Sequence, residues 1–470
     1  MKLLKTIVIF AALFSQFTMN AQSQPVKNYE SAWKRVEDFV KKNLPRSASA
    51  EVKKIYELAK KENQDAQVIK SLVYLSFLQS ENREDNQAAS ISEFEKELAL
   101  SKEPVRSILK SLLAEMYWNY YQQNRWGLYN RTKTTSFKKE DMATWGADDF
   151  HQKVGALYLS SLQAEVTLQK TRLEPFDAII VKGNMRHLRP TLFDLLAHRA
   201  LQYFENDERD ISKPAYAFEI DQASAFDPAA DFVHRIFPNR DSSSLQYQAL
   251  LVYQKLISFH LNDPRPDALI DADLKRLEFV RQKSVHPDKD QLYYNSINHV
   301  AHQYNELPAA AQAWYLVAEY YNRQADEYKP YEDTTHRYKR LKAKEICEKI
   351  LQQKDSSEGR VNCYNLLRQI ENETLQFSLE KVNLPGQPFR ALVGYRNFNK
   401  LYLRIIKPDE SLKKQLEDQY SEKYWPTILA AKPLRSWTQT LPETGDLQLH
   451  HAEIKIDALT PGEYLLIAGT

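Results

Sequence analysis

Histidine pairs are the first residues whose types and spacing suggest chemistry. His299 and His302 lie three residues apart, so a helix would place both imidazoles on one side, where they can bind a metal ion. The spacing is not that of a zinc peptidase, and no evident third ligand accompanies them. His450 and His451 are adjacent in an expected strand and therefore point to opposite faces. We predict solvated or capping histidines and no metal site.

A cluster of four aspartates is the second candidate. A calcium-binding loop needs a glycine at its sixth position, which is missing here, and two prolines stiffen the segment. We expect these carboxylates to form turns and to cap a helix that begins near Ala272. The four are Asp263, Asp267, Asp271 and Asp273.

Known catalytic motifs are missing from the sequence. It contains no G-x-S-x-G, no H-E-x-x-H and no glycine-rich phosphate loop. Its 10 glycines leave few places where the backbone could approach a phosphate. We therefore predict no enzyme activity, no cofactor, and no catalytic or cofactor-binding residues.

The two cysteines, Cys347 and Cys363, lie on consecutive expected helices. Two interpretations stay open for them. In an oxidising compartment the thiols can form a disulfide, whereas two small apolar side chains also suit a helix interface, which we favour.

An aromatic run crosses one expected helix and continues past it. Such side chains can form a stacking platform for a sugar or a peptide. At helical spacing they more often pack between helices, since each buries about 150–250 Å². We favour packing. The run comprises Tyr117, Trp118, Tyr120, Tyr121, Trp126 and Tyr129.

The elements that position these residues follow from where glycine and proline fall. Residues 1–374 hold five Gly and thirteen Pro, whereas the last 96 residues hold five Gly and seven Pro. This contrast predicts long helices followed by a β-domain with frequent turns. The 64 basic residues balance 62 acidic ones, and no segment concentrates one sign, which argues against a nucleic-acid partner.

The first 21 residues are typical of a signal peptide. Lys2 and Lys5 precede an apolar stretch over 3–17, which is too short for a membrane span and ends before Ala21. No cysteine follows it, so an acylated lipoprotein is disfavoured, and no later segment is apolar enough to span a membrane. We predict export to the periplasm, the cell surface or the medium.

Residues 22–373 repeatedly show the apolar period of an α-helix. The stripe from Val105 to Tyr120 is one long amphipathic helix, and residues 314–321 with 343–350 resemble the two helices of a tetratricopeptide unit. No 34-residue period is sustained, so we predict an all-α region of irregular helix pairs, solenoid-like or tetratricopeptide-like. Further helices are expected over 47–59, 68–78, 151–170, 190–205, 245–260, 272–282, 291–304, 308–328, 337–353 and 359–370.

From Thr374 the apolar period changes to two, which is typical of strands. Six strands separated by turns predict an antiparallel β-sandwich over 374–470, with a polar helical insertion near 411–422. The strands are expected over 375–380, 389–395, 401–405, 434–441, 452–458 and 464–468.

Several motifs in this tail are specific enough to compare with a known family. They are Leu384-Pro385-Gly386-Gln387-Pro388-Phe389, Val393-Gly394-Tyr395-Arg396-Asn397, Leu401-Tyr402-Leu403-Arg404-Ile405, Pro433-Leu434-Arg435-Ser436-Trp437, Leu441-Pro442, Gly445-Asp446, Glu453-Ile454-Lys455-Ile456 and Pro461-Gly462-Glu463-Tyr464. Together they resemble the first macroglobulin-type β-domain of bacterial alpha-2-macroglobulin-like proteins. Tyr29-Glu30-Ser31-Ala32-Trp33 and Tyr120-Tyr121-Gln122-Gln123-Asn124-Arg125-Trp126 resemble the helical extension of that family's exported members.

The resemblance implies a long exported protein built of β-sandwich domains in series. Some members of the family trap proteases after a bait segment is cut. It places no functional residue here, because neither Cys347 nor Cys363 lies in a thioester motif and no bait region is found. We count six strands where the family has seven, the last without a closing loop before Thr470, so we expect the N-terminal part of a longer protein.

Two functions follow as hypotheses. The first is the scaffold region of an endopeptidase inhibitor, with proteins, proteases among them, as partners. The second is a helical-repeat module of the cell envelope that binds a protein without inhibiting it.

Overall fold

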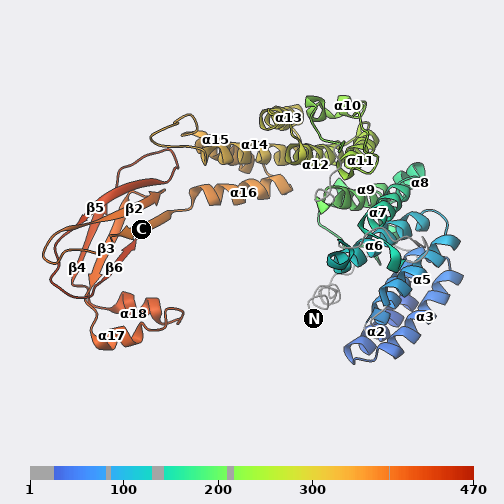
Figure 1. Ribbon diagram of the computed structural model, residues 1–470, viewed down its shortest axis with the longest axis horizontal. Coiled ribbons are helices and arrows are strands. Elements are labelled where there is room, and N and C mark those ends of the chain that lie inside the picture. The colour runs from blue at the N-terminus through green and yellow to red at the C-terminus, as the bar shows by residue number, and fades with distance from the viewer. Residues whose placement is uncertain (1–25, 81–85, 130–141, 209–215, 381) are drawn as a thin grey trace. The chain divides into compact units, whose positions relative to one another are not determined.

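The computed structural model describes residues 26–80, 86–129, 142–208, 216–380 and 382–470 (Figure 1). The signal peptide expected over 1–21 lies outside these residues. The protein is of the α+β class, mainly helical, with two small antiparallel sheets toward the C-terminus. The chain forms two compact units, 1–217 with 241–252 and 218–240 with 253–470. The division therefore falls within helix α11 (Leu245–His260).

The first unit consists of helices in which neighbours along the chain pack together. In α3, Pro45 occupies the first turn, where its missing N–H costs nothing, and Val52, Ile55 and Ala59 are buried on one side. The helices are α2 (Val26–Lys41), α3 (Pro45–Lys61), α4 (Asp65–Ser80), α5 (Asn86–Leu100), α6 (Val105–Tyr129), α7 (Ala147–Ser161), α8 (Glu165–Lys170) and α9 (Leu192–Phe204), with short 3₁₀ turns at Met142–Thr144, Glu174–Phe176 and Arg186–Leu188.

The aromatic run lies in the core of this first unit. Tyr117 and Tyr121 are buried on α6, and Tyr117 stacks on Trp145 with ring centroids 5.5 Å apart. Trp118 stacks on Tyr121 at 5.3 Å. The packing interpretation is confirmed for these side chains, whereas Trp126 is exposed.

The second unit begins with a loop segment and continues as a series of helices. Buried Arg276 on α12 holds this segment, because its guanidinium donates to the backbone carbonyls of Ala225 (2.6 Å) and Asp227 (2.9 Å). The elements are η5 (Ala223–Phe226), α10 (Ala229–Phe232), α12 (Asp267–Lys283), α13 (Lys289–Gln303), α14 (Ala310–Ala325), α15 (Lys339–Leu351) and α16 (Glu358–Glu371).

Helices α14, α15 and α16 pack closely because small residues meet at their interface. Ala318, Ala343, Cys347 and Cys363 are fully buried in one cluster. Gly359 allows the closest approach, since a β-carbon there would stand 2.1 Å from the backbone nitrogen of Gln312. Both thiols are free, which agrees with the packing interpretation, and a hydrogen bond with Cys363, together with burial, raises the pKa of the Cys347 thiol.

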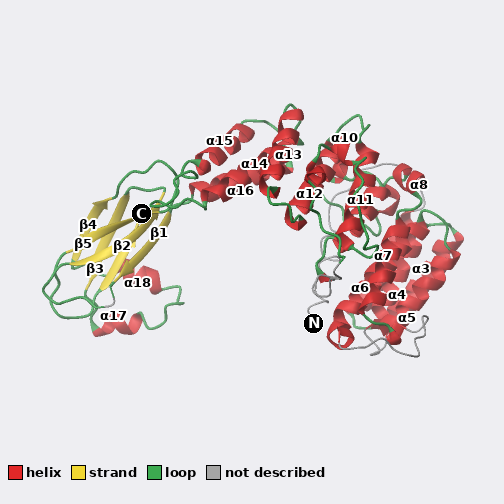
Figure 2. Cartoon of the chain, turned by 45° about the horizontal axis from the view of Figure 1, so that its top comes forward, coloured by secondary structure: helices red, strands yellow, loops and turns green. Residues whose placement is uncertain are grey.

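The β-domain follows directly, since α16 ends at Glu371 and β1 begins at Thr374. Two three-stranded antiparallel sheets have the orders β1-β2-β5 and β4-β3-β6 (Figure 2). The register pairs Val393 of β2 with Phe377 and Ala452, and Leu403 of β3 with Trp437 and Ala468. The strands are β1 (Thr374–Leu379), β2 (Phe389–Arg396), β3 (Lys400–Ile406), β4 (Arg435–Thr440), β5 (His450–Ile456) and β6 (Leu465–Gly469).

The two sheets share one apolar core. Ala391, Val393 and Tyr395 of β2 are buried with Leu401 and Leu403 of β3. The period-two pattern read from the sequence therefore separates core from solvent, as expected for sheets with one covered face.

Several expected elements differ from those observed. Helix α12 begins at Asp267, so the expected start near Ala272 is wrong, and the aspartates from Asp267 onward lie inside the helix. The single helix expected over 151–170 is two helices, α7 and α8. The insertion expected to be helical over 411–422 forms only the short helix α17 (Glu410–Gln415), and a second short helix that was not expected, α18 (Tyr424–Ala430), follows it. Among the described helices none is long and apolar enough to cross a bilayer.

Candidate functional site

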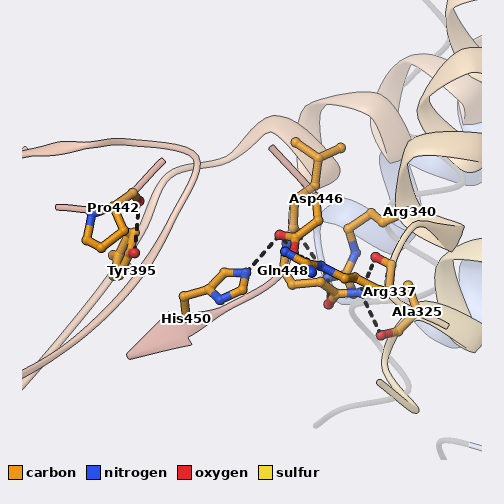
Figure 3. Close-up of polar contacts among 9 residues, drawn as sticks. Ala325, Arg337, Arg340, Tyr395, Pro442, Asp446, Gln448 and His450 are labelled. Atoms are coloured by element: carbon orange, nitrogen blue, oxygen red, sulfur yellow. Dashed lines mark hydrogen bonds and ion pairs between the residues drawn. The ribbon is translucent and has the colours of Figure 1, made fainter. Parts of the chain in front are cut away.

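The most developed polar site lies inside the second unit, where the β-domain meets the α14–α15 pair. The loop between β4 and β5 reaches the C-terminal end of α14 and the start of α15 (Figure 3). We call this the junction and define it by Arg337, Arg340, Asp446, Gln448 and His450. Its contacts span more than 100 positions in sequence, as with Arg337 and Asp446, which are 109 residues apart.

Asp446 is the centre of the junction and its side chain is fully buried. One carboxylate oxygen accepts a hydrogen bond from Nε of Arg337 at 2.8 Å. The other lies 2.8 Å from Nε2 of His450 and accepts from the backbone N–H of Gln448 at 3.1 Å. A buried carboxylate is tolerated only when such donors surround it.

The electrostatics of Asp446 follow from these contacts. Burial alone would raise the pKa of its carboxyl group. Hydrogen bonds from His450 and Arg337, and from the backbone N–H of Gln448, outweigh burial and lower the pKa below its usual value. The carboxylate is therefore ionised in the folded protein at neutral pH.

Arg340 joins the helices to the same loop. Its Nη1 donates to the backbone carbonyl of Leu447 at 3.1 Å and to Oε1 of Gln448 at 3.0 Å. On the helical side, Nε donates to Asn322 at 3.0 Å and Nη2 pairs with Asp326. The planar guanidinium thus makes hydrogen bonds both to the helical pair and to the loop between β4 and β5.

Gln448 completes the junction by satisfying backbone groups of the helical pair. Its side-chain amide donates to the carbonyls of Ala325 (3.0 Å) and Arg337 (3.2 Å). Ala325 is the last residue of α14, so its carbonyl has no partner within the helix and accepts from this amide as well as from the backbone N–H of Tyr328 at 3.3 Å. The preceding residue, Leu447, has φ +59° and packs its side chain on the core of α14–α16.

A second attachment lies at the turn between β2 and β3. Asn397 has φ +65°, a conformation that asparagine tolerates better than most residues. Its side-chain nitrogen donates to the carbonyls of Ile370 (2.7 Å) and Asn372 (3.0 Å) at the end of α16. The β-domain is therefore fixed to the helices at two separate points.

The histidines singled out in the sequence do not assemble a metal site. Nδ1 of His302 lies 2.8 Å from the carbonyl of Asn298, and its ring meets Trp314 edge to face, while His299 is exposed. His450 belongs to the junction, whereas its neighbour His451 is exposed. Throughout the described residues no group of three or more metal-ligating side chains gathers.

The aspartate cluster is likewise dispersed. Asp263 pairs with His260 at 2.7 Å and Asp267 with Arg265 at 3.3 Å. Asp273 is buried and pairs with Arg276 one turn along α12. These carboxylates hold local structure.

Sequence reasoning missed the junction. Gly445-Asp446 was recognisable only as part of a family-like motif, and no role followed from it. The available signal was a polar loop, Asp446 and Gln448, flanking the apolar Leu447, together with two arginines three residues apart, Arg337 and Arg340. Nothing in the sequence pairs segments so distant.

Comparison of the chain with known protein families, with curated proteins and with solved structures finds no match.

Proposed function

We propose that this chain is a protein-binding scaffold, the N-terminal region of an exported protein resembling the alpha-2-macroglobulin class, some of whose members inhibit endopeptidases. The observation that carries the proposal is the buried junction around Asp446. Polar networks of this kind fix one arrangement of the parts they join, because any displacement leaves buried charges without partners. A scaffold needs such a fixed relation between its surfaces.

The β-domain carries apolar side chains suited to a protein partner. Tyr420, Trp425 and Leu429 lie on or beside the α17–α18 insertion, with exposed fractions of 88%, 60% and 58%. Exposed apolar residues that gather on one insertion are typical of interaction sites rather than of inert surface. They supply a contact surface for the proposed partner.

The class assignment is supported by where the family-like motifs fall. Gly386, Gly445 and Gly462 of those motifs have positive φ values of 72°, 62° and 155°. Each lies in a turn or loop of the β-domain, at a positive φ that glycine adopts at the lowest energetic cost. These family-like motifs therefore place glycines at reversals of the chain in the β-domain.

The inhibitor function is tested with the protein as it is exported by its own cells. We would incubate it with serine, cysteine and metalloproteases and compare hydrolysis of a protein substrate with hydrolysis of a small peptide substrate. A trap blocks the first and spares the second. Inhibition would be contradicted if, with every protease, both substrates were hydrolysed as fast as by the protease alone and the protein itself were not cleaved.

A binding module without inhibitor activity is the alternative, favoured by the exposed insertion. Capture experiments from envelope extract would compare the wild-type protein with Trp425→Ser and with Tyr402→Ser, a control at an exposed tyrosine of β3. A partner lost only with Trp425→Ser, in a protein that inhibits no protease, supports this alternative. Recovery of the same proteins by all three would contradict a site on the insertion.

A further inference from the structure

A cleft in the helical part of the second unit has no role in the junction. It has a volume of about 460 Å³ and lies where the end of α12, the start of α13 and the C-terminal half of α14 meet. This size is within the range of small-molecule sites. Charged side chains line it, among them Glu278, Arg281, Asp290, Glu319 and Arg323.

Part of the lining is already neutralised. Nε of Arg281 lies 2.7 Å from a carboxylate oxygen of Asp290, and its guanidinium carbon lies 5.1 Å from the ring centroid of buried Tyr293. The Lys289 ammonium group donates to the backbone carbonyl of Ser284 at 3.0 Å. These groups therefore already have partners within the protein.

Arg323 is different. Its Nε is buried and has no hydrogen-bond partner among the described residues. An unsatisfied buried donor is unfavourable, and guanidinium groups form strong charge-assisted hydrogen bonds with carboxylates and phosphates. Glu319 stands one turn earlier on the same helix, so the cleft presents an anion beside this cation.

Glu278 faces these residues from α12. Although its side chain is exposed, the protein atoms around its carboxyl group raise its pKa, and the nearby charge of Glu319 raises it further. Lys275 and Arg323 act in the opposite direction. A ligand cation between Glu278 and Glu319 would relieve the repulsion of two carboxylates in one site.

We propose that this cleft binds a small zwitterion of the amino-acid or short-peptide class, with its carboxylate on Arg323 and its ammonium group between Glu278 and Glu319. A ligand with a single charge satisfies only one of these sides. Apart from the paired Arg281 and Asp290, the charged residues of the lining are Glu278, Glu319, Lys289 and Arg323. Their charges sum to zero, which favours a ligand that also has no net charge.

The test is titration calorimetry on the whole protein. The probes are leucine, lysine and glutamate as free amino acids, dialanine as a longer zwitterion, and N-acetylleucine and leucinamide, which each lack one charge. We expect at least one zwitterion to bind, and the singly charged leucine derivatives to bind at least about tenfold more weakly than leucine. Comparing the affinities of leucine and dialanine then shows which distance between the ammonium and carboxylate groups fits the cleft better. Absence of binding by every zwitterion would overturn the proposal.

Variants assign the site. Arg323→Gln and Glu278→Gln should each weaken binding by about tenfold or more, while Arg390→Gln, which breaks an exposed pair with Glu453 on the β-domain, should leave it unchanged. Circular dichroism checks that each variant folds. Glu278 is exposed, so its variant remains informative if Arg323→Gln fails to fold. Unchanged affinity in folded Glu278→Gln would place the zwitterion elsewhere and overturn the assignment.

Discussion

The helices α14–α16 and the β-domain are held in order by different means. In the helices, alanine, cysteine and Gly359 bring backbones close together, and the contacts join three helices that are near one another in sequence. In the β-domain, partners such as β2 and β5 are distant in sequence, and the outer strands β4 and β6 contain no fully buried residue. The β-domain compensates by hydrogen bonding to the helices at the junction.

Close packing and charge therefore have separate roles in the second unit. Close packing tolerates no added volume, since protein interiors are as dense as crystals. A polar network tolerates no missing partner, since each loss leaves a buried charge. The two regions should therefore fail under opposite kinds of substitution.

The largest effect is expected from Asp446→Ala. It leaves Arg337, His450 and the N–H of Gln448 without their shared acceptor, and the loss of three hydrogen bonds to one charged group should cost about 3–5 kcal/mol. Hydrogen exchange should accelerate by about a hundredfold or more at the β4–β5 loop and the adjoining strand β5. Asp457→Ala, which breaks an exposed pair with Arg435, is the control and should change little.

Gly359→Ala tests the close packing of the helices by adding one methyl group. Because the new β-carbon would meet backbone atoms of Ala311 and Gln312, α16 must move, and we expect stability to fall by about 3 kcal/mol. Urea denaturation measures the loss. The same substitution at Gly127 of α6, where a β-carbon meets nothing within 4 Å, should raise stability by about 0.5 kcal/mol. Equal effects at both glycines would contradict the close approach.

A smaller effect is expected inside the β-domain. The buried Tyr395 donates its hydroxyl hydrogen to the carbonyl of Pro442 at 2.9 Å, so Tyr395→Phe should cost about 1 kcal/mol. Tyr402→Phe on β3, where the ring is exposed, is the matched control. A shift of the urea midpoint in Tyr402→Phe as large as in Tyr395→Phe would count against this hydrogen bond.

The smallest effect is a dependence on pH. The folded-state pKa of Asp446 lies below the unfolded value of about 3.9, so its contribution to stability is complete above about pH 4 and is lost as the pH falls through the folded pKa. The wild-type protein should therefore lose stability in acid more steeply than Asp446→Asn. Urea midpoints at pH 3, 4 and 6 measure this difference. Parallel curves would show that the carboxylate is not specially stabilised.

Much of the fold could be predicted from the sequence, because its signals are local. The stripe ending at Tyr120 gave α6, and the change of period at Thr374 marked the start of β1. Helix α5 was missed, since only two of its large apolar residues, Ile91 and Phe94, are buried and they form no long stripe, and α18 was missed because Pro426 stands inside it. Such elements depend on tertiary contacts more than on propensity.

The candidate site could not be predicted for a related reason. Arg340 looks like an ordinary surface charge on a lysine-rich helix, and only the folded chain brings it to Leu447 and Gln448. Likewise, the sequence pointed to His299 and His302, whose spacing is local, whereas His450 has the buried partner Asp446. Spacing along a helix reveals neighbours on that helix alone.

The left-handed backbone of Leu447 has a consequence for how the protein is assembled. A leucine at φ +59° is disfavoured in an isolated loop, so the loop should reach this shape only where α14 and α15 already stand to receive its side chain and carbonyl. The chain is made from its N-terminus, and Arg337 emerges 109 residues before Asp446. The helical pair can thus serve as a template, and the β-domain takes its final form on a surface made earlier by the same chain.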